Sequence, residues 1–110
     1  MTPRPQSKLI RRLQDLAERA IQGTLVEVML RCGTPSCGCH QDPSRRHGPH
    51  LYLKFRDANG RSTSLYSPRR RERELREAVA AWSRMWQTML QLSHHNREAL
   101  KKRLRRKPRA

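Results

Sequence analysis

Three cysteines within eight residues constrain this chain more than any other feature. Cys32, Cys37 and Cys39 follow the spacing C-x4-C-x-C in a segment rich in Gly, Pro and His. Zn²⁺ in structural sites takes four Cys or His ligands in a tetrahedron. A chain of 110 residues buries only a modest core, so a bound metal would add folding free energy. We therefore predict that the three thiols hold a structural Zn²⁺.

The fourth ligand is chosen among three nearby histidines. His47 is preferred, because the seven residues between it and Cys39 let the loop turn back on itself. His40 directly follows a cysteine and would have to reach round the metal. His50 falls on the outward face of a predicted strand, and it stays an alternative. Three reduced thiols without a metal, or one disulfide with a leftover thiol, are the other interpretations of this pattern.

An amphipathic helix is predicted on each side of this segment. The first follows Ser7 as N-cap, continues for about 15 residues, and ends at Gly23. The second takes Ser67 as N-cap and Pro68 at its first position, and extends to about Arg106.

The second helix has an apolar stripe with steps of four, three, four and three residues. This is coiled-coil spacing, which predicts core or oligomer contacts and a homodimer or protein partner through this helix. Beyond Ser93 the stripe weakens, and His94, His95 and Asn96 are a candidate break in the helix. The stripe consists of Leu75, Val79, Trp82, Trp86 and Met89.

Three strands are predicted between the helices. Residues 24–31 place Val26, Val28 and Leu30 on one face, and residues 50–56 alternate in the same way. Asp-Ala-Asn-Gly at 57–60 fits a type I turn followed by a glycine in the left-handed region. With this turn, Asp57 lies opposite Arg61, Phe55 opposite Thr63, and Leu53 opposite Leu65.

The predicted fold class is therefore α+β. A small three-stranded antiparallel sheet with a zinc-binding loop is flanked by an N-terminal helix and a long C-terminal helix. We expect a flexible N-terminus at residues 1–6, a single zinc-stabilised domain at 7–96, and a basic C-terminal tail at 97–110.

The motif around the cysteines resembles a family of short bacterial proteins of unknown function. Cys-Gly-Thr-Pro-Ser-Cys-Gly-Cys, followed by His-Gly-Pro-His-Leu-Tyr-Leu, is similar to that family's C-G-x-P-x-C-x-C and H-G-P-Y signature. The resemblance covers about residues 23–68 and differs at His50, where the family tends to have Tyr. It implies a zinc-ribbon-like protein, often associated with mobile elements, with Cys32, Cys37, Cys39 and His47 as signature residues.

The charge of the chain points to a polyanionic partner. Lys and Arg number 25 and Asp and Glu 9, so the formal charge is +16. Such a protein attracts nucleic acid, with an anionic membrane or an acidic protein as alternatives. No apolar run has the length of a membrane span, and no secretory signal is visible. We expect no membrane partner and a cytoplasmic location in bacteria, associated with the nucleoid or a ribonucleoprotein.

Candidate nucleic-acid contacts fall into three groups. The outer sheet face offers side chains for base edges and phosphates. The start of the second helix combines cations with free N–H groups, which is typical of phosphate sites, and the tail is suited to sequence-independent phosphate contact. The groups are Tyr52, Lys54 and Arg56; Arg69, Arg70, Arg71 and Arg73; and Lys101, Lys102, Arg103, Arg105, Arg106 and Lys107.

Catalysis has little support in this sequence. No Gly-rich phosphate loop or nucleophile elbow is present, and Asp42 is the one carboxylate in the cysteine loop. We expect a non-enzymatic accessory protein that binds nucleic acid, with duplex DNA favoured. The alternatives are a structured-RNA-binding component of a ribonucleoprotein and an oligomeric protein-interaction module.

Overall fold

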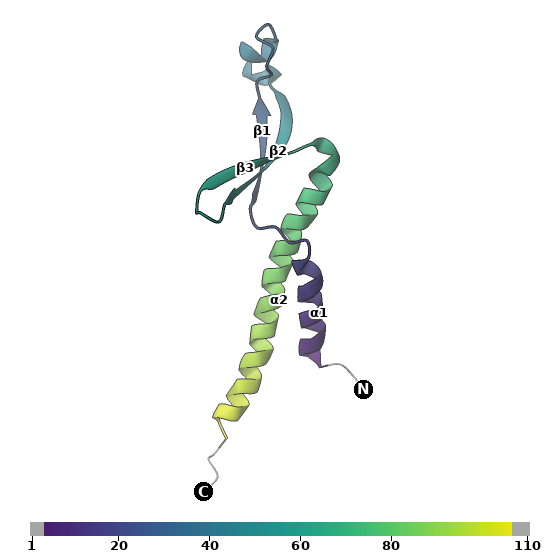
Figure 1. Ribbon diagram of the computed structural model, residues 1–110, viewed down its shortest axis with the longest axis vertical. Coiled ribbons are helices and arrows are strands. Elements are labelled where there is room, and N and C mark those ends of the chain that lie inside the picture. The colour runs from purple at the N-terminus through teal and green to yellow at the C-terminus, as the bar shows by residue number, and fades with distance from the viewer. Residues whose placement is uncertain (1–3, 107–110) are drawn as a thin grey trace. The chain divides into compact units, whose positions relative to one another are not determined.

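The computed structural model describes residues 4–106, and its element order confirms the predicted α+β class (Figure 1). Residues 1–3 of the predicted flexible N-terminus lie outside the described residues, as do residues 107–110 with Lys107. The chain divides into two compact units. One, the helical unit, consists of Met1–Ala20 with Ala80–Ala110 and contains helices in its described part; the other, Ile21–Val79, holds the sheet and the cysteine loop.

Helix α1 spans Pro5–Ala17 and differs at both ends from the prediction. Its N-cap residue is Arg4, not Ser7, because a proline in the first turn already has a helical φ and has no N–H to satisfy. The helix ends at Ala17, well before Gly23. The amide of Ala20 still donates to the Leu16 carbonyl, at 2.9 Å, and closes the last turn.

Helix α2 spans Glu72–Leu104. The predicted start was wrong by several residues, since Ser67 is the last residue of a strand and Pro68 caps a short 3-10 helix, η3, at Arg69–Arg71. The predicted break at His94–Asn96 is also absent, because the α-helix is continuous through these three residues. Among the helices of residues 4–106, none is long and apolar enough to cross a membrane.

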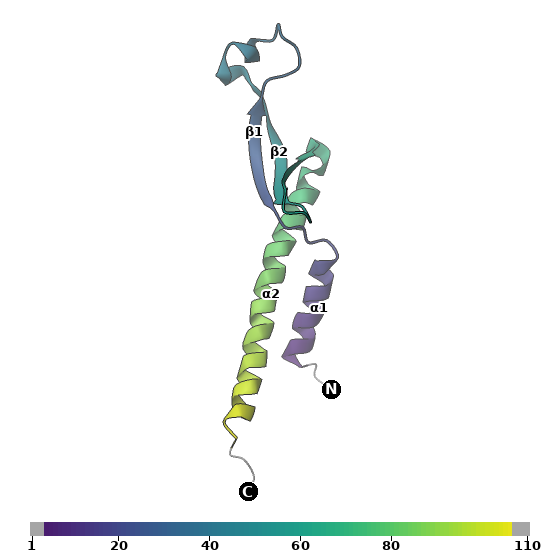
Figure 2. The ribbon, with the colours of Figure 1, turned by 60° about the vertical axis from the view of Figure 1, so that its left-hand side comes forward.

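In the helical unit, the residues that α2 buries are not those of the predicted apolar stripe. Ala81 and Thr88 are buried, with 2% and 3% of their surface exposed. Trp82 and Trp86 are 38% and 56% exposed, so they lie outside the core, and the oligomer contacts predicted as the alternative for them stay a prediction. Small residues let a neighbouring helix approach closely, whereas the large indole rings project away from the packed side. Figure 2 shows α1 alongside this part of α2.

The sheet has the order β1-β2-β3 and is antiparallel throughout. Strand β1 spans Thr24–Leu30, β2 spans His47–Arg56 and β3 spans Ser62–Ser67. Strand β2 begins three residues earlier than predicted.

The hairpin between β2 and β3 has the predicted register. Leu53 pairs with Leu65 and Phe55 with Thr63. The Asp57 amide donates to the Arg61 carbonyl at 2.9 Å, and Gly60 has a φ of +78°. This left-handed glycine completes the bulged turn, which confirms that local turn chemistry sets the pairing.

The inner face of the sheet carries the core of its unit. Leu51 and Leu53 are 1% and 2% exposed, and their partners on β1 are Glu27 and Leu25. The start of α2 lies over this face, since Arg76 Nη2 is 2.6 Å from Glu27 Oε1. The apolar Val26 and Val28 therefore lie on the opposite face.

Candidate metal centre and basic surfaces

Strand pairing brings the two ends of the cysteine loop together. Leu30, the last residue of β1, pairs with His47, the first residue of β2, after a register shift that follows Val28. Cys32 lies two residues beyond Leu30. His47 at the start of β2 and Cys32 just beyond the end of β1 are thus both placed at the base of the same loop.

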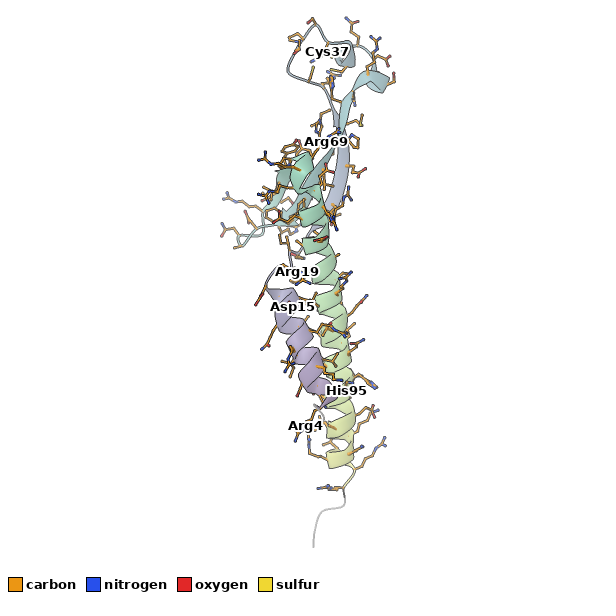
Figure 3. The ribbon with its side chains drawn as sticks, turned by 90° about the vertical axis from the view of Figure 1, so that its right-hand side faces the viewer. Arg4, Asp15, Arg19, Cys37, Arg69 and His95 are labelled. Atoms are coloured by element: carbon orange, nitrogen blue, oxygen red, sulfur yellow. The ribbon has the colours of Figure 1, made fainter. Side chains whose placement is uncertain are left out.

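Short turns place the other two cysteines over this base. The Cys37 amide donates to the Thr34 carbonyl at 3.0 Å, and Cys39 lies in the 3-10 helix η1, Gly38–His40. A second 3-10 helix, η2 at Pro43–Arg45, is capped by Asp42, whose carboxylate accepts from the Ser44 amide at 3.0 Å. Figure 3 labels Cys37 in this loop, beyond the ends of β1 and β2.

The four predicted ligand atoms form a compact cluster. The three Sγ atoms and the His47 ring nitrogen all lie within 4.8 Å of one another. Cys37 Sγ is 3.3 Å from His47 Nε2, and Cys39 Sγ is 3.5 Å from Cys32 Sγ. Ligands about 2.3 Å from a tetrahedral Zn²⁺ are roughly 3.7 Å apart. The cluster therefore has the size and donor set of a four-ligand metal site.

The structure places the other two histidines outside the cluster. His40 Nε2 is 2.7 Å from the Cys32 carbonyl oxygen, so this ring braces the loop backbone. The His50 ring packs edge-on against Tyr66, with ring centroids 6.0 Å apart. Of the three histidines weighed from the sequence, His47 is the one that the fold brings to the thiols.

Hydrogen bonds shift the pKa values in the cluster. A backbone hydrogen bond at Thr34 lowers the pKa of Cys32 to about 6. The Cys39 backbone and the His47 ring lower the pKa of Cys37, and that thiol raises the pKa of His47. For Cys39, a backbone hydrogen bond from Cys32 lowers the pKa, but burial and the neighbouring sulfurs outweigh it and the pKa is raised. The pKa values of Cys32 and Cys37 are thus both shifted toward the thiolate, the form that binds metal.

The predicted nucleic-acid residues of the sheet share one face, as expected. Tyr52 pairs with Tyr66, and Lys54 and Arg56 pair with serines of β3. The Tyr52 and Tyr66 rings are 5.6 Å apart. Arg56 Nη1 donates to the Gly60 carbonyl at 3.0 Å, so its guanidinium is partly engaged with the turn.

The arginines at the start of α2 divide into two kinds. Arg71 is paired with Glu74 at 2.9 Å and Arg73 with Glu77 at 3.2 Å. Arg69 and Arg70 are exposed, and among the described residues no carboxylate pairs with them. The predicted phosphate site therefore keeps two cations that are not already neutralised.

The predicted cations at residues 101–106, in the last turn of α2 and just beyond its end, are all exposed. Lys101 pairs with Glu98 at 3.1 Å, while the other predicted residues described there have no carboxylate partner within residues 4–106. These are Lys102, Arg103, Arg105 and Arg106.

A groove between α1 and α2 holds basic residues that the sequence reasoning missed. It has a volume of about 560 Å³. Lys8 and Arg12 are one helical turn apart on α1, a spacing that could have revealed them. The two histidines of the groove belong to the predicted helix break and lie within the continuous α2. Its basic lining comprises Lys8, Arg12, His94 and His95, the last labelled in Figure 3.

The sequence of this chain matches a known protein family. Residues 4–77 match the family described as Domain of unknown function (DUF6788). The chain belongs to this family. In this DUF6788 protein the match includes α1, the sheet, the Cys/His cluster and the first turns of α2. The rest of α2, with its exposed indoles and basic end, lies outside the match. No curated protein and no solved structure matches the chain.

Proposed function

We propose that this DUF6788 protein is a zinc-stabilised, non-catalytic protein that binds nucleic acid, with duplex DNA as its favoured ligand. Zinc serves the fold in this proposal, and the basic surfaces bind phosphates. The two parts rest on different observations and are tested separately.

A structural zinc is supported by the small core of the sheet unit. Leu51, Leu53, Ala78 and Cys39 are the apolar residues buried there among those described. A core of this size contributes little stability without a staple. The loop from 31 to 46 contains no strand, so a tetrahedral ion would add the cross-link that its short turns lack. Three cysteines and one histidine leave no open coordination position, which suits a structural role rather than a catalytic one.

Nucleic-acid binding is carried by the distribution of charge. The helical unit contains fourteen Lys and Arg residues against three Asp and Glu, so it carries eleven of the sixteen net positive charges. Cations crowded on two helices repel one another and are stabilised when they neutralise phosphates. We propose two sites of contact with the phosphate backbone of nucleic acid. These are the groove with Lys8 and Arg12 and the last turns of α2.

Duplex DNA is favoured by the sheet face. A three-stranded antiparallel sheet with Lys54 and Arg56 on its outer side resembles the sheets that read DNA grooves, an analogy at the level of the fold. The resemblance of the cysteine motif adds a bacterial origin and an association with a mobile element, and we include both in the proposal. Because the proposed ligand is nucleic acid, we also propose a location in the cytoplasm, in association with the nucleoid or a ribonucleoprotein.

Fluorescence anisotropy with the zinc-loaded full chain tests this function. A labelled duplex DNA and a labelled RNA hairpin of equal length are titrated over a series of salt concentrations. The association constant should be larger for the duplex than for the hairpin. Its logarithm should fall linearly with the logarithm of the salt concentration. Tighter binding to the hairpin would replace DNA with structured RNA. Absence of binding to both at low salt would refute the proposal.

A further inference from the structure

The exposed side of α2 in the helical unit carries an apolar stripe, which polar residues interrupt between Leu90 and Leu100. Successive residues of an α-helix are about 100° apart, so the five side chains fall within about 80° of one another around the axis. Isolated apolar residues are common on protein surfaces, but five in one row mark an interaction site. The row consists of Trp82, Trp86, Leu90, Leu100 and Leu104, which are 38%, 56%, 56%, 46% and 73% exposed.

We propose that this stripe pairs with the same stripe of a second copy of the chain, with the two α2 helices antiparallel. The homodimer does not depend on nucleic acid, so it goes beyond the function proposed above. Trp82, Trp86 and Leu100 follow the alternating steps of four and three residues that are typical of a coiled-coil seam, and Leu90 and Leu104 flank that seam. An antiparallel pair has a two-fold axis and uses one surface on both copies.

Polar residues within the stripe favour a helix partner over a lipid surface. Ser93, Asn96 and Arg97 lie between Leu90 and Leu100 on the same side of α2. Arg97 Nη2 donates to Ser93 Oγ at 3.2 Å, but an apolar lipid environment would leave the Asn96 amide and the other guanidinium donors of Arg97 without partners. In a helix pair they lie at a seam with water at its edges, where a single polar position also selects the register and orientation.

The charge of the helix end selects the antiparallel orientation. Residues 97–106 contain six Lys and Arg against one Glu. A parallel pair would set these two ends side by side. An antiparallel pair that crosses near Leu90 separates the centres of the two basic ends by roughly 35 Å, at 1.5 Å per residue. That separation exceeds the screening length of about 8 Å at physiological salt, so the repulsion is largely removed.

This crossing point also gives the apolar side chains suitable partners. Leu90 meets Leu90 of the other copy near the two-fold axis, and Trp82 lies beside Leu100 of the other copy. Trp86 then faces Arg97 of the other copy, a pairing in which a guanidinium stacks on an indole face. Each exposed indole is covered, and no basic end meets another.

Light scattering on the nuclease-treated chain of residues 1–110 in high salt tests the dimer. We expect twice the chain mass for the natural sequence. Trp86→Glu should weaken association about 100-fold, as loss of a central aromatic contact does. Ala80→Glu adds the same charge at an exposed position of α2 outside the stripe and should leave the dimer intact. Circular dichroism shows whether Trp86→Glu keeps its helices, and Leu90→Glu serves as a second disrupting variant.

A photo-crosslinking residue at position 82 tests the orientation in a mixture of isotopically light and heavy copies. Crosslinks between copies should join position 82 to the peptide that contains Leu100. Crosslinks between the two copies of position 82 would show a parallel pair and overturn the proposal. A monomer at high protein concentration would also overturn it, whether or not that monomer binds mixed phosphatidylcholine and phosphatidylserine vesicles.

Discussion

Leu30 pairs with His47 at the end of the β1–β2 ladder, and this pairing carries the His47 imidazole to 3.3 Å from Cys37 Sγ. The metal-ligand cluster is thus built on a strand pair and completed by two short turns. Two of its four members lie next to regular structure, so their positions are set by the sheet rather than by the loop.

Replacement of His47 by alanine should remove the fourth ligand. We expect the protein purified under reducing conditions to hold about one zinc per chain, as a four-ligand site requires. His47→Ala should retain much less zinc and should melt at a lower temperature, because metal binding contributes to folding. The measurement is zinc content by mass spectrometry together with a thermal melt.

His50→Ala is the matched control for this change. His50 lies three residues along the same strand and contacts Tyr66 instead of the thiols. It should keep its zinc, and a chelator should lower its melting temperature as in the natural protein. Equal zinc loss in the two variants would remove His47 from the ligand set.

Gly48→Ala should destabilise the hairpin that carries the cluster. Gly48 has a φ of +136°, and a Cβ there would lie 2.8 Å from the Val28 carbonyl oxygen. Both effects penalise alanine, and we expect a loss of about 1–3 kcal/mol in the free energy of unfolding. Urea denaturation measures it. Gly33→Ala, in the same loop with no atom within 4 Å of its Cβ, should change stability by less than about 0.5 kcal/mol.

Truncation of Leu53 and of Leu65 should have different effects on the free energy of unfolding, because one side chain is buried and the other is exposed. The two side chains are cross-strand partners, but Leu53 is 2% exposed and Leu65 is 54% exposed. Leu53→Ala should cost about 2–5 kcal/mol, and Leu65→Ala less than about 1 kcal/mol. Similar losses in urea denaturation would mean that Leu65 is covered in solution, by a second copy or another partner.

The arginines at the start of α2 should differ in their effect on nucleic-acid binding. Arg69→Ala with Arg70→Ala should reduce the salt slope by up to about 1.8, since each neutralised phosphate contributes about 0.9. Arg71→Ala with Arg73→Ala removes cations already paired with Glu74 and Glu77, and a smaller reduction is expected. The slopes are measured with one duplex over a salt series. No change for Arg69 and Arg70 would exclude this group from the interface.

The sequence by itself determined the features that depend on neighbouring residues. The Asp57–Gly60 turn determined the β2–β3 register, because a left-handed glycine permits one bulged geometry. The spacing of Cys32, Cys37 and Cys39 indicated a clustered ligand set, because residues so close along the chain cannot be far apart in space. The alternation in β2 likewise located the buried Leu51 and Leu53.

Tertiary structure decided the features that depend on distant partners. His47 was one of three candidate ligands until the β1–β2 pairing placed it near the thiols. The alternation in β1 did not determine which of its two faces lies toward the core. The pairing of Leu25 with Leu53 and of Glu27 with Leu51 determined it. The apolar stripe of α2 has one helical periodicity, and periodicity alone does not say which side the first helix covers. The first helix packs on the side of α2 that carries small residues such as Ala81, and this leaves Trp86 exposed.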